Sequence, residues 1–278
     1  MSRRVLVTGG ASGLGAALVA SFVERGDEVL VADISEGGSD ELDRPGTSYL
    51  RLDVTSDEGW AAALSHVEER WGGLDVLVNN AGIASGGRID VATLEEWQRV
   101  IDVNLLGVVR GCRTFVPLLK AQGSGHIVNT ASLAGLVHPP GMASYNAVKA
   151  GVVALSETLQ FELAPYGIHT SVVCPSFFRT NLASSLAGSD TILDGIARRL
   201  IDRSSTTADQ IAAEVMKGID AQRPVILTDK PARRAAFAKR YTRPLYEKEQ
   251  LGFARRIQEA AERGDTGSTA RSTTKGGA

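Results

Sequence analysis

The chain has 278 residues, 43% of them hydrophobic, and its 30 Lys and Arg residues against 32 Asp and Glu residues give a formal net charge of −2. This length allows one large α/β domain with a buried core, and the near-neutral charge argues against nucleic acid as a partner. Two cysteines are too few for a disulfide framework or a structural zinc site, so no metal is expected.

The start of the chain lacks the pattern of a signal peptide. Only three apolar residues, 5–7, follow the basic start before glycines interrupt them, whereas a signal peptide needs an apolar stretch of about 7–15 residues. No uncharged apolar stretch reaches the roughly 20 residues of a membrane span. We therefore expect a soluble, cytoplasmic protein without membrane contact.

Short apolar runs alternate with helical patterns along the chain. Runs rich in β-branched residues predict buried parallel strands at 5–7, 29–32, 49–52, 76–78, 126–129, 170–173 and 224–228. Segments with 3.6-residue periodicity include 14–25, 57–71, 93–119 and 143–166. This alternation predicts an α/β fold with a doubly wound parallel sheet, a Rossmann fold, which binds ligands beyond the carboxyl ends of its strands.

The composition changes after residue 229. Residues 230–263 hold ten Lys or Arg against four Asp or Glu, whereas residues 1–229 hold 18 against 27. We expect one domain over 1–229, a basic helical extension over 230–263 with breaks near Pro231 and Pro244, and a disordered Gly/Ser/Thr-rich tail over 264–278. Three apolar residues share one face of the extension: Phe253, Ile257 and Ala261. A solvated face is favoured over contact with a membrane or an acidic partner.

A glycine-rich segment, 8–15, lies between the first predicted strand and the first predicted helix. Its sequence is Thr-Gly-Gly-Ala-Ser-Gly-Leu-Gly. Glycines permit a tight turn and close approach of phosphates, while the helix N-terminus offers free N–H groups to a pyrophosphate. The segment therefore predicts a dinucleotide site. The candidate cofactor-binding residues are Gly9, Ser12, Gly13, Leu14 and Gly15.

Asp33 ends the second predicted strand, 18 residues after Gly15. A carboxylate in this place can accept hydrogen bonds from the adenosine ribose hydroxyls and would repel a 2′-phosphate. Neighbouring residues that might hold that phosphate carry no positive charge. Asp33 thus favours NAD over NADP, the alternative being a carboxylate that only caps a loop.

Ser132, Tyr145 and Lys149 form a candidate catalytic set. Tyr145 and Lys149 are four residues apart on one predicted helix, so their side chains share a face. A nearby ammonium and a positive nicotinamide ring would lower the tyrosine pKa from its ordinary value near 10. Tyr145 would then serve as general acid and base, while Ser132 holds the substrate oxygen.

With these residues in place, the chain resembles the short-chain dehydrogenase/reductase family. The matching motifs include Thr8-Gly9-x-x-x-Gly13-x-Gly15, Asp53-Val54, Asn79-Asn80-Ala81-Gly82, Asn104, Ser132, Tyr145-x-x-x-Lys149, and Pro175 through Thr180. The resemblance implies an oxidoreductase that moves a hydride between NAD and a secondary alcohol or its ketone. Two alternatives use the same scaffold: a sugar-nucleotide epimerase or dehydratase, and an NAD-sensing binding protein.

The resemblance also implies individual roles. Asp53 and Val54 would meet the adenine, and Asn80 would line the adenosine ribose. Tyr145 and Lys149 would contact the cofactor, with Lys149 on the nicotinamide ribose. Asn104 would hold a water that relays protons to Lys149, although on residue type alone it could be a packing or helix-kink asparagine. Pro175, Phe178 and Thr180 would fix the carboxamide end.

The chain departs from the family at two places. Ser176 stands where the family often has glycine, and the basic extension replaces a glycine-rich C-terminal end that helps many relatives form tetramers. We expect a homodimer or homotetramer, a dimer being built on the helices that carry Asn104 and Tyr145.

The substrate pocket is expected just past the nicotinamide site. Its candidate residues are His138, Met142, Phe177, Leu182 and Leu186. The apolar members suggest an apolar substrate under a mobile lid, with core packing as the alternative. A solvent-facing position is the alternative for His138.

Overall fold

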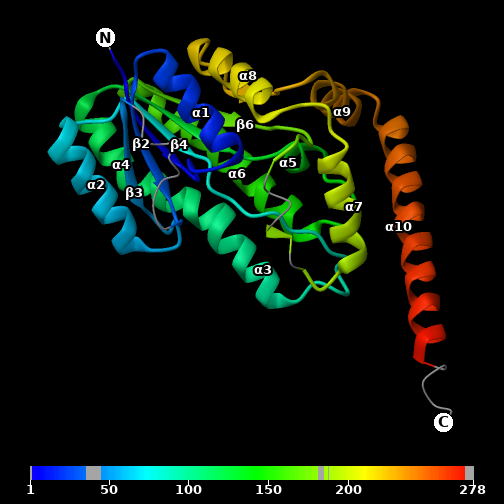
Figure 1. Cartoon of the computed structure of the whole chain (residues 1–278). Helices are drawn as coiled ribbons and strands as arrows, with labels where there is room; N and C mark the ends of the chain where they lie inside the picture. Colours follow the sequence, from blue (N-terminus) through cyan, green and yellow to red (C-terminus); the bar gives the residue numbers. More distant parts are fainter. Residues whose placement is uncertain (1, 36–44, 181–184, 187, 273–278) are drawn as a thin grey trace.

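The computed structural model describes residues 2–35, 45–180, 185–186 and 188–272, with side chains up to residue 263. One sheet of seven parallel strands has the order β3-β2-β1-β4-β5-β6-β7 (Figure 1). The strands are β1 Arg4–Thr8, β2 Glu28–Asp33, β3 Thr47–Arg51, β4 Val76–Asn79, β5 Gly125–Thr130, β6 Ile168–Val173 and β7 Val225–Ile226. The strand order changes direction between β1 and β4, which is where such sheets bind ligands. The predicted doubly wound fold is confirmed.

Helices cover both faces of the sheet. Helices that contribute to the cores on these faces are α1 Gly13–Glu24, α2 Asp57–Trp71, α4 Gly107–Gln122, α6 Ala143–Leu163 and α8 Ala208–Asp220. Successive strand residues point to opposite faces, so Leu6 joins a core beneath α2, α4 and α6, while Val5 and Val7 join a second core beneath α1 and α8. All three side chains are fully buried.

The helix predicted over 93–119 is divided into three parts. The helix α3 spans Leu94–Ile101, a π-helical turn spans Asp102–Leu106, and α4 continues to Gln122. Thr93 starts α3 with a capping box to Glu96, as their three-residue spacing favours. A π turn inserts an extra residue into a helix and is often found at functional sites. It places Asn104 in the interior of the protein.

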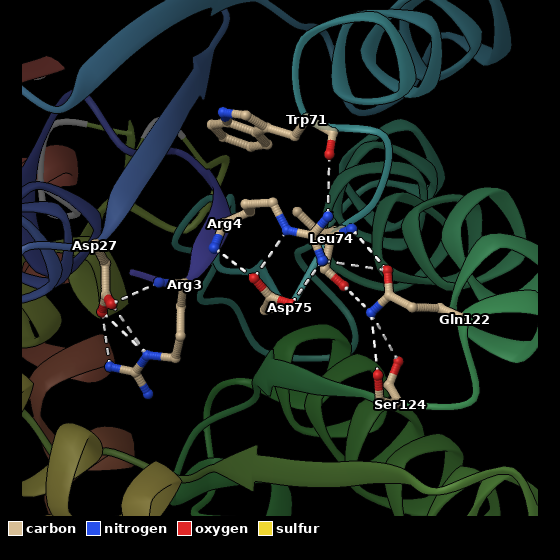
Figure 2. A network of polar contacts seen from close by, with 8 residues as sticks. All are labelled: Arg3, Arg4, Asp27, Trp71, Leu74, Asp75, Gln122 and Ser124. Atoms are coloured by element: carbon tan, nitrogen blue, oxygen red, sulfur yellow. Dashed lines mark hydrogen bonds and ion pairs between the residues drawn. The ribbon is translucent and has the colours of Figure 1, made fainter. Parts of the chain in front are cut away.

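A network of ion pairs joins the amino ends of the strands, at the sheet edge opposite the predicted site (Figure 2). Both oxygens of Asp75 accept hydrogen bonds from the Arg4 guanidinium, at 2.7 and 2.9 Å, and Arg3 contacts Asp27 at 2.7 Å. The Gln122 amide donates to the Leu74 carbonyl. The pKa of Asp75 is lowered, because its hydrogen bonds to Arg4 outweigh the desolvation of the carboxylate.

The remaining helices lie toward the carboxyl end of the sheet. They are α5 Ala134–Val137, α7 Thr191–Asp202, α9 Lys230–Tyr241 and α10 Arg243–Ser272. The proline-associated breaks predicted in the extension are the starts of α9 and α10, since Pro231 and Pro244 occupy first helical turns. The backbone of α10 is helical up to Ser272, whereas disorder was expected from residue 264. The division of the chain into a domain, an extension and a tail at residues 229 and 263 stays a prediction.

The apolar face expected on the extension, formed by Phe253, Ile257 and Ala261, is partly confirmed by burial. Ile257 and Ala261 are only 5% and 8% exposed. Among the described residues, no helix combines the length and the apolar character needed to cross a membrane. The two cysteines, Cys112 and Cys174, are buried free thiols.

Candidate active site

A cavity of about 640 Å³ lies at the carboxyl ends of the strands. Most of the predicted site residues line it: Gly9, Ser12, Gly13, Leu14, Asp33, Asp53, Val54, Asn80, Ser132, Met142, Tyr145, Lys149, Pro175, Phe177, Phe178, Thr180 and Leu186. Three predicted residues do not line it: Gly15, Asn104 and His138. Leu182 lies outside the described residues. The fold therefore gathers segments distant in sequence around one space.

The glycine-rich segment forms the floor of this cavity in a shape that favours glycine. Gly9 and Gly13 have φ values of +63° and +54°, in the left-handed region. A Cβ on Gly15 would stand 2.0 Å from the Gly9 carbonyl oxygen, so α1 packs against the loop without space for a side chain. Helix α1 begins at Gly13, and its Ser12 cap makes no side-chain hydrogen bond. This cradle fits a pyrophosphate, which would bind to free N–H groups at the helix N-terminus.

Asp33 lies at the end of β2 beside the cradle. One carboxylate oxygen accepts the Ala11 N–H at 3.0 Å, and the other accepts the N–H and hydroxyl of Ser35, both at 3.1 Å. These bonds hold the carboxylate at the cavity wall and leave it partly exposed. The side chain thus caps the turn, and its effect on cofactor choice stays a prediction.

Asn80 joins the glycine loop to β4. Its side-chain amide donates to the carbonyls of Thr8 and Gly9 at 3.1 and 3.3 Å, while its backbone N–H binds the Thr8 hydroxyl at 2.9 Å. Its side-chain oxygen accepts a bond from the Thr130 hydroxyl at 3.4 Å. Asn80 therefore supports the loop from below as well as lining the cavity.

Tyr145 and Lys149 lie one turn apart near the start of α6, and both are at least nine-tenths buried. The Lys149 ammonium donates to the Thr130 carbonyl at 2.9 Å and lies 5.8 Å from the centre of the Tyr145 ring. Burial lowers the pKa of Lys149 to about 8, since a desolvated ammonium is costly. The predicted proximity of the two side chains is confirmed.

The pKa of Tyr145 differs from the expectation. Burial raises it to about 12, and a hydrogen bond with Ser132 only partly opposes that rise. Desolvation dominates because the low dielectric around a buried phenol penalises the phenolate strongly. The protein groups alone thus keep Tyr145 protonated at neutral pH, whereas its proximity to the ammonium suggested a lowered pKa.

Asn104 is fully buried and binds the backbone of Ile83 on both sides. Its side-chain oxygen accepts the Ile83 N–H at 2.8 Å, and its amide donates to the Ile83 carbonyl at 2.9 Å. These two bonds fix the loop after β4, where Ile83 lines the cavity. The side chain thus binds backbone with one acceptor site and one N–H, and the water relay expected at Asn104 stays a prediction.

The loop after β6 closes the cavity over the glycine segment. The Pro175 carbonyl accepts the Leu133 N–H at 2.8 Å, which joins this loop to the one carrying Ser132. A Cβ on Gly13 would stand 2.7 Å from the Thr180 hydroxyl, so this loop returns close to the first helix. Phe178 packs against the core beneath α1. The residues predicted to hold the carboxamide end of the nicotinamide therefore lie on one loop. In the same loop, the Ser176 hydroxyl donates to the Asp229 carboxylate at 2.5 Å.

Apolar side chains dominate the end of the cavity near Tyr145. Met142, Phe177 and Leu186 line it as predicted. His138 is exposed and turns away, toward Gly135 and Lys239, because it ends α5 in a left-handed conformation with φ of 52°. This confirms the solvent-facing alternative for His138.

Helix α7, which no motif in the sequence indicated, forms a further wall of the cavity. Ala197 and Ile201 line the cavity, and Leu193 is buried one turn earlier. Their four-residue spacing was the available signal. An ion pair holds the start of this helix, because the carboxylate of its N-cap residue Asp190 lies 2.7 Å from the Arg88 guanidinium.

Comparisons with known proteins agree with this geometry. A family model described as short chain dehydrogenase matches residues 3–190. The chain is 34% identical over 226 residues to 2-(R)-hydroxypropyl-CoM dehydrogenase of Xanthobacter autotrophicus, which covers 78% of this chain and 90% of the relative. It is 33% identical over 198 residues to NADP-dependent (R)-specific alcohol dehydrogenase of Lentilactobacillus kefiri, covering 68% and 78% of the two chains.

A solved structure has the same fold. The crystal structure of a short chain dehydrogenase/reductase from Burkholderia phymatum in complex with NAD is 29% identical, with a TM-score of 0.81, over 88% of this chain and 95% of that chain. The family match spans the cradle, the loop after β4 and helix α6, which carries Tyr145 and Lys149. The chain therefore belongs to the short-chain dehydrogenase/reductase family and is an oxidoreductase.

Proposed function

We propose that this chain is an NAD-dependent dehydrogenase that interconverts an apolar secondary alcohol and its ketone. The observation that carries the proposal is the shared cavity, which joins the Ser132, Tyr145 and Lys149 set to the glycine cradle and Asp33. Apolar walls at the catalytic end suit a substrate with little polar surface beyond its reacting oxygen.

The catalytic side chains would divide the proton chemistry between them. The nicotinamide cofactor, when bound, accepts or donates a hydride, and its oxidised ring adds positive charge that favours the tyrosinate. Ser132 holds the substrate oxygen, and Tyr145 takes the hydroxyl proton during oxidation or returns it during reduction. Lys149, with a pKa lowered to about 8, exchanges protons readily near neutral pH. Asn104 supports this arrangement through the Ile83 loop.

The cofactor would occupy the cavity from the cradle to the catalytic end. The pyrophosphate would lie on the N-terminus of α1, with Asp53 and Val54 at the adenine and Asn80 near its ribose. Pro175, Phe178 and Thr180 would hold the nicotinamide end, together with Lys149 at its ribose.

Asp33 supports NAD over NADP. Its carboxylate is held at the cavity wall, and the described lining residues beside it, Ile34, Asp53 and Thr55, carry no positive charge. A 2′-phosphate there would meet a fixed negative charge. The alcohol dehydrogenase of Lentilactobacillus kefiri is NADP-dependent, so the cofactor preference of this chain needs a direct measurement.

The first test measures NADH and NADPH formation with a panel of secondary alcohols. We expect NADH formation on apolar alcohols, and Tyr145→Phe should lower the rate by about 10²–10⁴-fold while NAD⁺ binding is kept. Wild-type rates in Tyr145→Phe would refute the mechanism. NAD⁺ binding without turnover of any alcohol would instead favour a binding protein, and bound cofactor without net NADH release would favour an epimerase.

The cofactor test uses Asp33→Asn, which removes the charge and keeps an acceptor for Ala11. We expect NAD⁺ affinity to fall roughly tenfold, since hydrogen bonds to charged groups contribute about 1.5–3 kcal/mol, and NADP⁺ affinity to rise. Glu69→Gln, on the exposed side of α2, is the control. A wild-type enzyme that prefers NADP⁺ would refute the role of Asp33.

We also propose that the chain forms a homodimer through α4 and α6. Phe161 on α6 is 74% exposed, and a dimer built on this helix would bury its apolar side chain. Light scattering should give twice the mass of one chain, and Phe161→Glu should give monomers. A monomeric wild type would refute the proposal.

A further inference from the structure

The C-terminal extension lies against the catalytic end of the molecule. Helix α9 contacts α5, and α10 contacts both α9 and α7 (Figure 1). These contacts bring the last helices to the loop between Ser132 and Tyr145, whose residues 136–142 we call the rim loop. Three residues of the rim loop line the cavity: Val137, Pro139 and Met142.

The short helix α5 leaves its last carbonyls in need of donors, as every helix does. His138 supplies two of them. Its backbone N–H donates to the Ala134 carbonyl at 3.1 Å, and its ring Nε2 donates to the Gly135 carbonyl at 3.0 Å. The ring is therefore in the tautomer with the proton on Nε2, and its Nδ1 is an acceptor.

The extension supplies donors to the next two carbonyls. The Lys239 ammonium of α9 donates to the Leu136 carbonyl at 2.6 Å and to His138 Nδ1 at 2.5 Å. The Tyr246 hydroxyl of α10 donates to the Val137 carbonyl, and its side chain is buried. An ammonium at a helix C-terminus also interacts favourably with the helix dipole. The end of α5 is thus completed by residues about a hundred positions away.

The rest of the rim loop is held by the main domain and by packing. The Pro139 carbonyl accepts the Asn146 amide at 2.7 Å, and the Gly141 carbonyl accepts the Gly87 N–H at 2.8 Å. A Cβ on Gly141 would stand 2.3 Å from Leu193 and 3.1 Å from Ile257, so the loop passes between α7 and α10. Only its first part, 136–138, takes its hydrogen bonds from the extension among the described contacts.

A second attachment holds the start of α9. Asp229 caps this helix by accepting the Ala232 N–H at 2.7 Å, and its other oxygen accepts the Ser176 hydroxyl at 2.5 Å. Ser176 lines the cavity on the loop after β6. Helix α9 therefore joins the two loops that bound the catalytic end of the cavity.

We propose that the extension holds the rim loop in place behind the substrate end of the cavity and that Lys239 and Tyr246 are positioning residues which set substrate selectivity. Neither lines the cavity, and both act through the carbonyls of residues 136 and 137. When those two carbonyls are hydrogen-bonded, the part of the cavity wall formed by Val137 and Pro139 stays in one position. The fixed wall then limits the size of the substrate that the cavity can hold. This rests on the proposed function for the identity of the reaction.

The variants Tyr246→Phe and Lys239→Met remove the two donors while keeping most of each side chain. Matched controls are Tyr241→Phe and Lys248→Met, which change exposed residues of the same helices. Two measurements are made on the full chain. The first is amide hydrogen exchange over 134–142. The second is kcat and KM for a small and a bulky secondary alcohol.

We expect exchange over 134–142 to become about tenfold faster in both variants, because a buried carbonyl loses its donor. The ratio of kcat/KM for the two alcohols should change by about tenfold through KM, with NAD⁺ binding unchanged. Lys239→Arg, which keeps the donors, should restore the wild-type ratio. Neither control should alter either measurement.

Unchanged exchange in both variants would overturn the proposal, and so would faster exchange with an unchanged selectivity ratio. A wild type that turns over neither alcohol would refute the proposed function separately. In that case the exchange data still decide whether the extension holds the rim loop.

Discussion

Replacing Lys149 by Met is expected to abolish turnover and yet leave the protein as stable as the wild type, or more stable, at pH 7. Burial lowers the pKa of Lys149 from 10.5 to about 8. Since one pKa unit corresponds to about 1.4 kcal/mol, the buried charge costs about 3 kcal/mol at pH 7. Methionine removes that cost but leaves the Thr130 carbonyl without its donor, which costs about 1–3 kcal/mol. The net gain is about 0–2 kcal/mol.

The sign of the pH dependence separates this effect from simple packing. Between pH 8 and 10.5 the unfolded chain holds its Lys149 proton while the folded chain loses it, so wild-type stability rises with pH. The advantage of Lys149→Met should therefore fall by about 2–3 kcal/mol between pH 7 and pH 10. Urea unfolding at both pH values measures this, with the exposed Lys248→Met as control. An equal stability difference at the two pH values would refute the argument.

Three further changes test the support of the site. Gly15→Ala places a methyl 2.0 Å from a backbone oxygen, so it should cost about 1–3 kcal/mol in thermal unfolding and weaken NAD⁺ binding in calorimetry; unaltered binding would contradict the cradle. Asn104→Ala leaves both polar groups of Ile83 without partners and should cost about 1–3 kcal/mol in urea unfolding; wild-type stability would contradict this. Asp75→Asn should destabilise the protein at pH 7, and the difference should shrink as pH falls below 3.8, because the lowered pKa of Asp75 gives stability that is lost as pH falls through the folded-state pKa; a difference independent of pH would contradict the ion-pair argument.

The motifs of the site could be predicted from the sequence because each one involves residues that are close together in the chain. The glycine segment needs residues without a Cβ between a strand and a helix, and Tyr145 and Lys149 need only one helical turn between them. The contacts that hold the rim loop could not be predicted in this way. Contacts such as that between Tyr246 and Val137 join residues 109 positions apart, and no spacing rule records them.

The sequence by itself determined the strands, the parallel sheet and the segments that meet at its carboxyl edge, because alternation, β-branching and glycine act over short distances. Only the tertiary structure decided the environment of those residues. Burial raises the pKa of Tyr145, although its neighbour in sequence is a lysine, and the fold pairs Asn104 with backbone. It also brings the basic extension against the rim loop, where Lys239 and Tyr246 bind two backbone carbonyls. Desolvation and long-range hydrogen bonds depend on everything packed around a group, and a linear pattern does not contain that information.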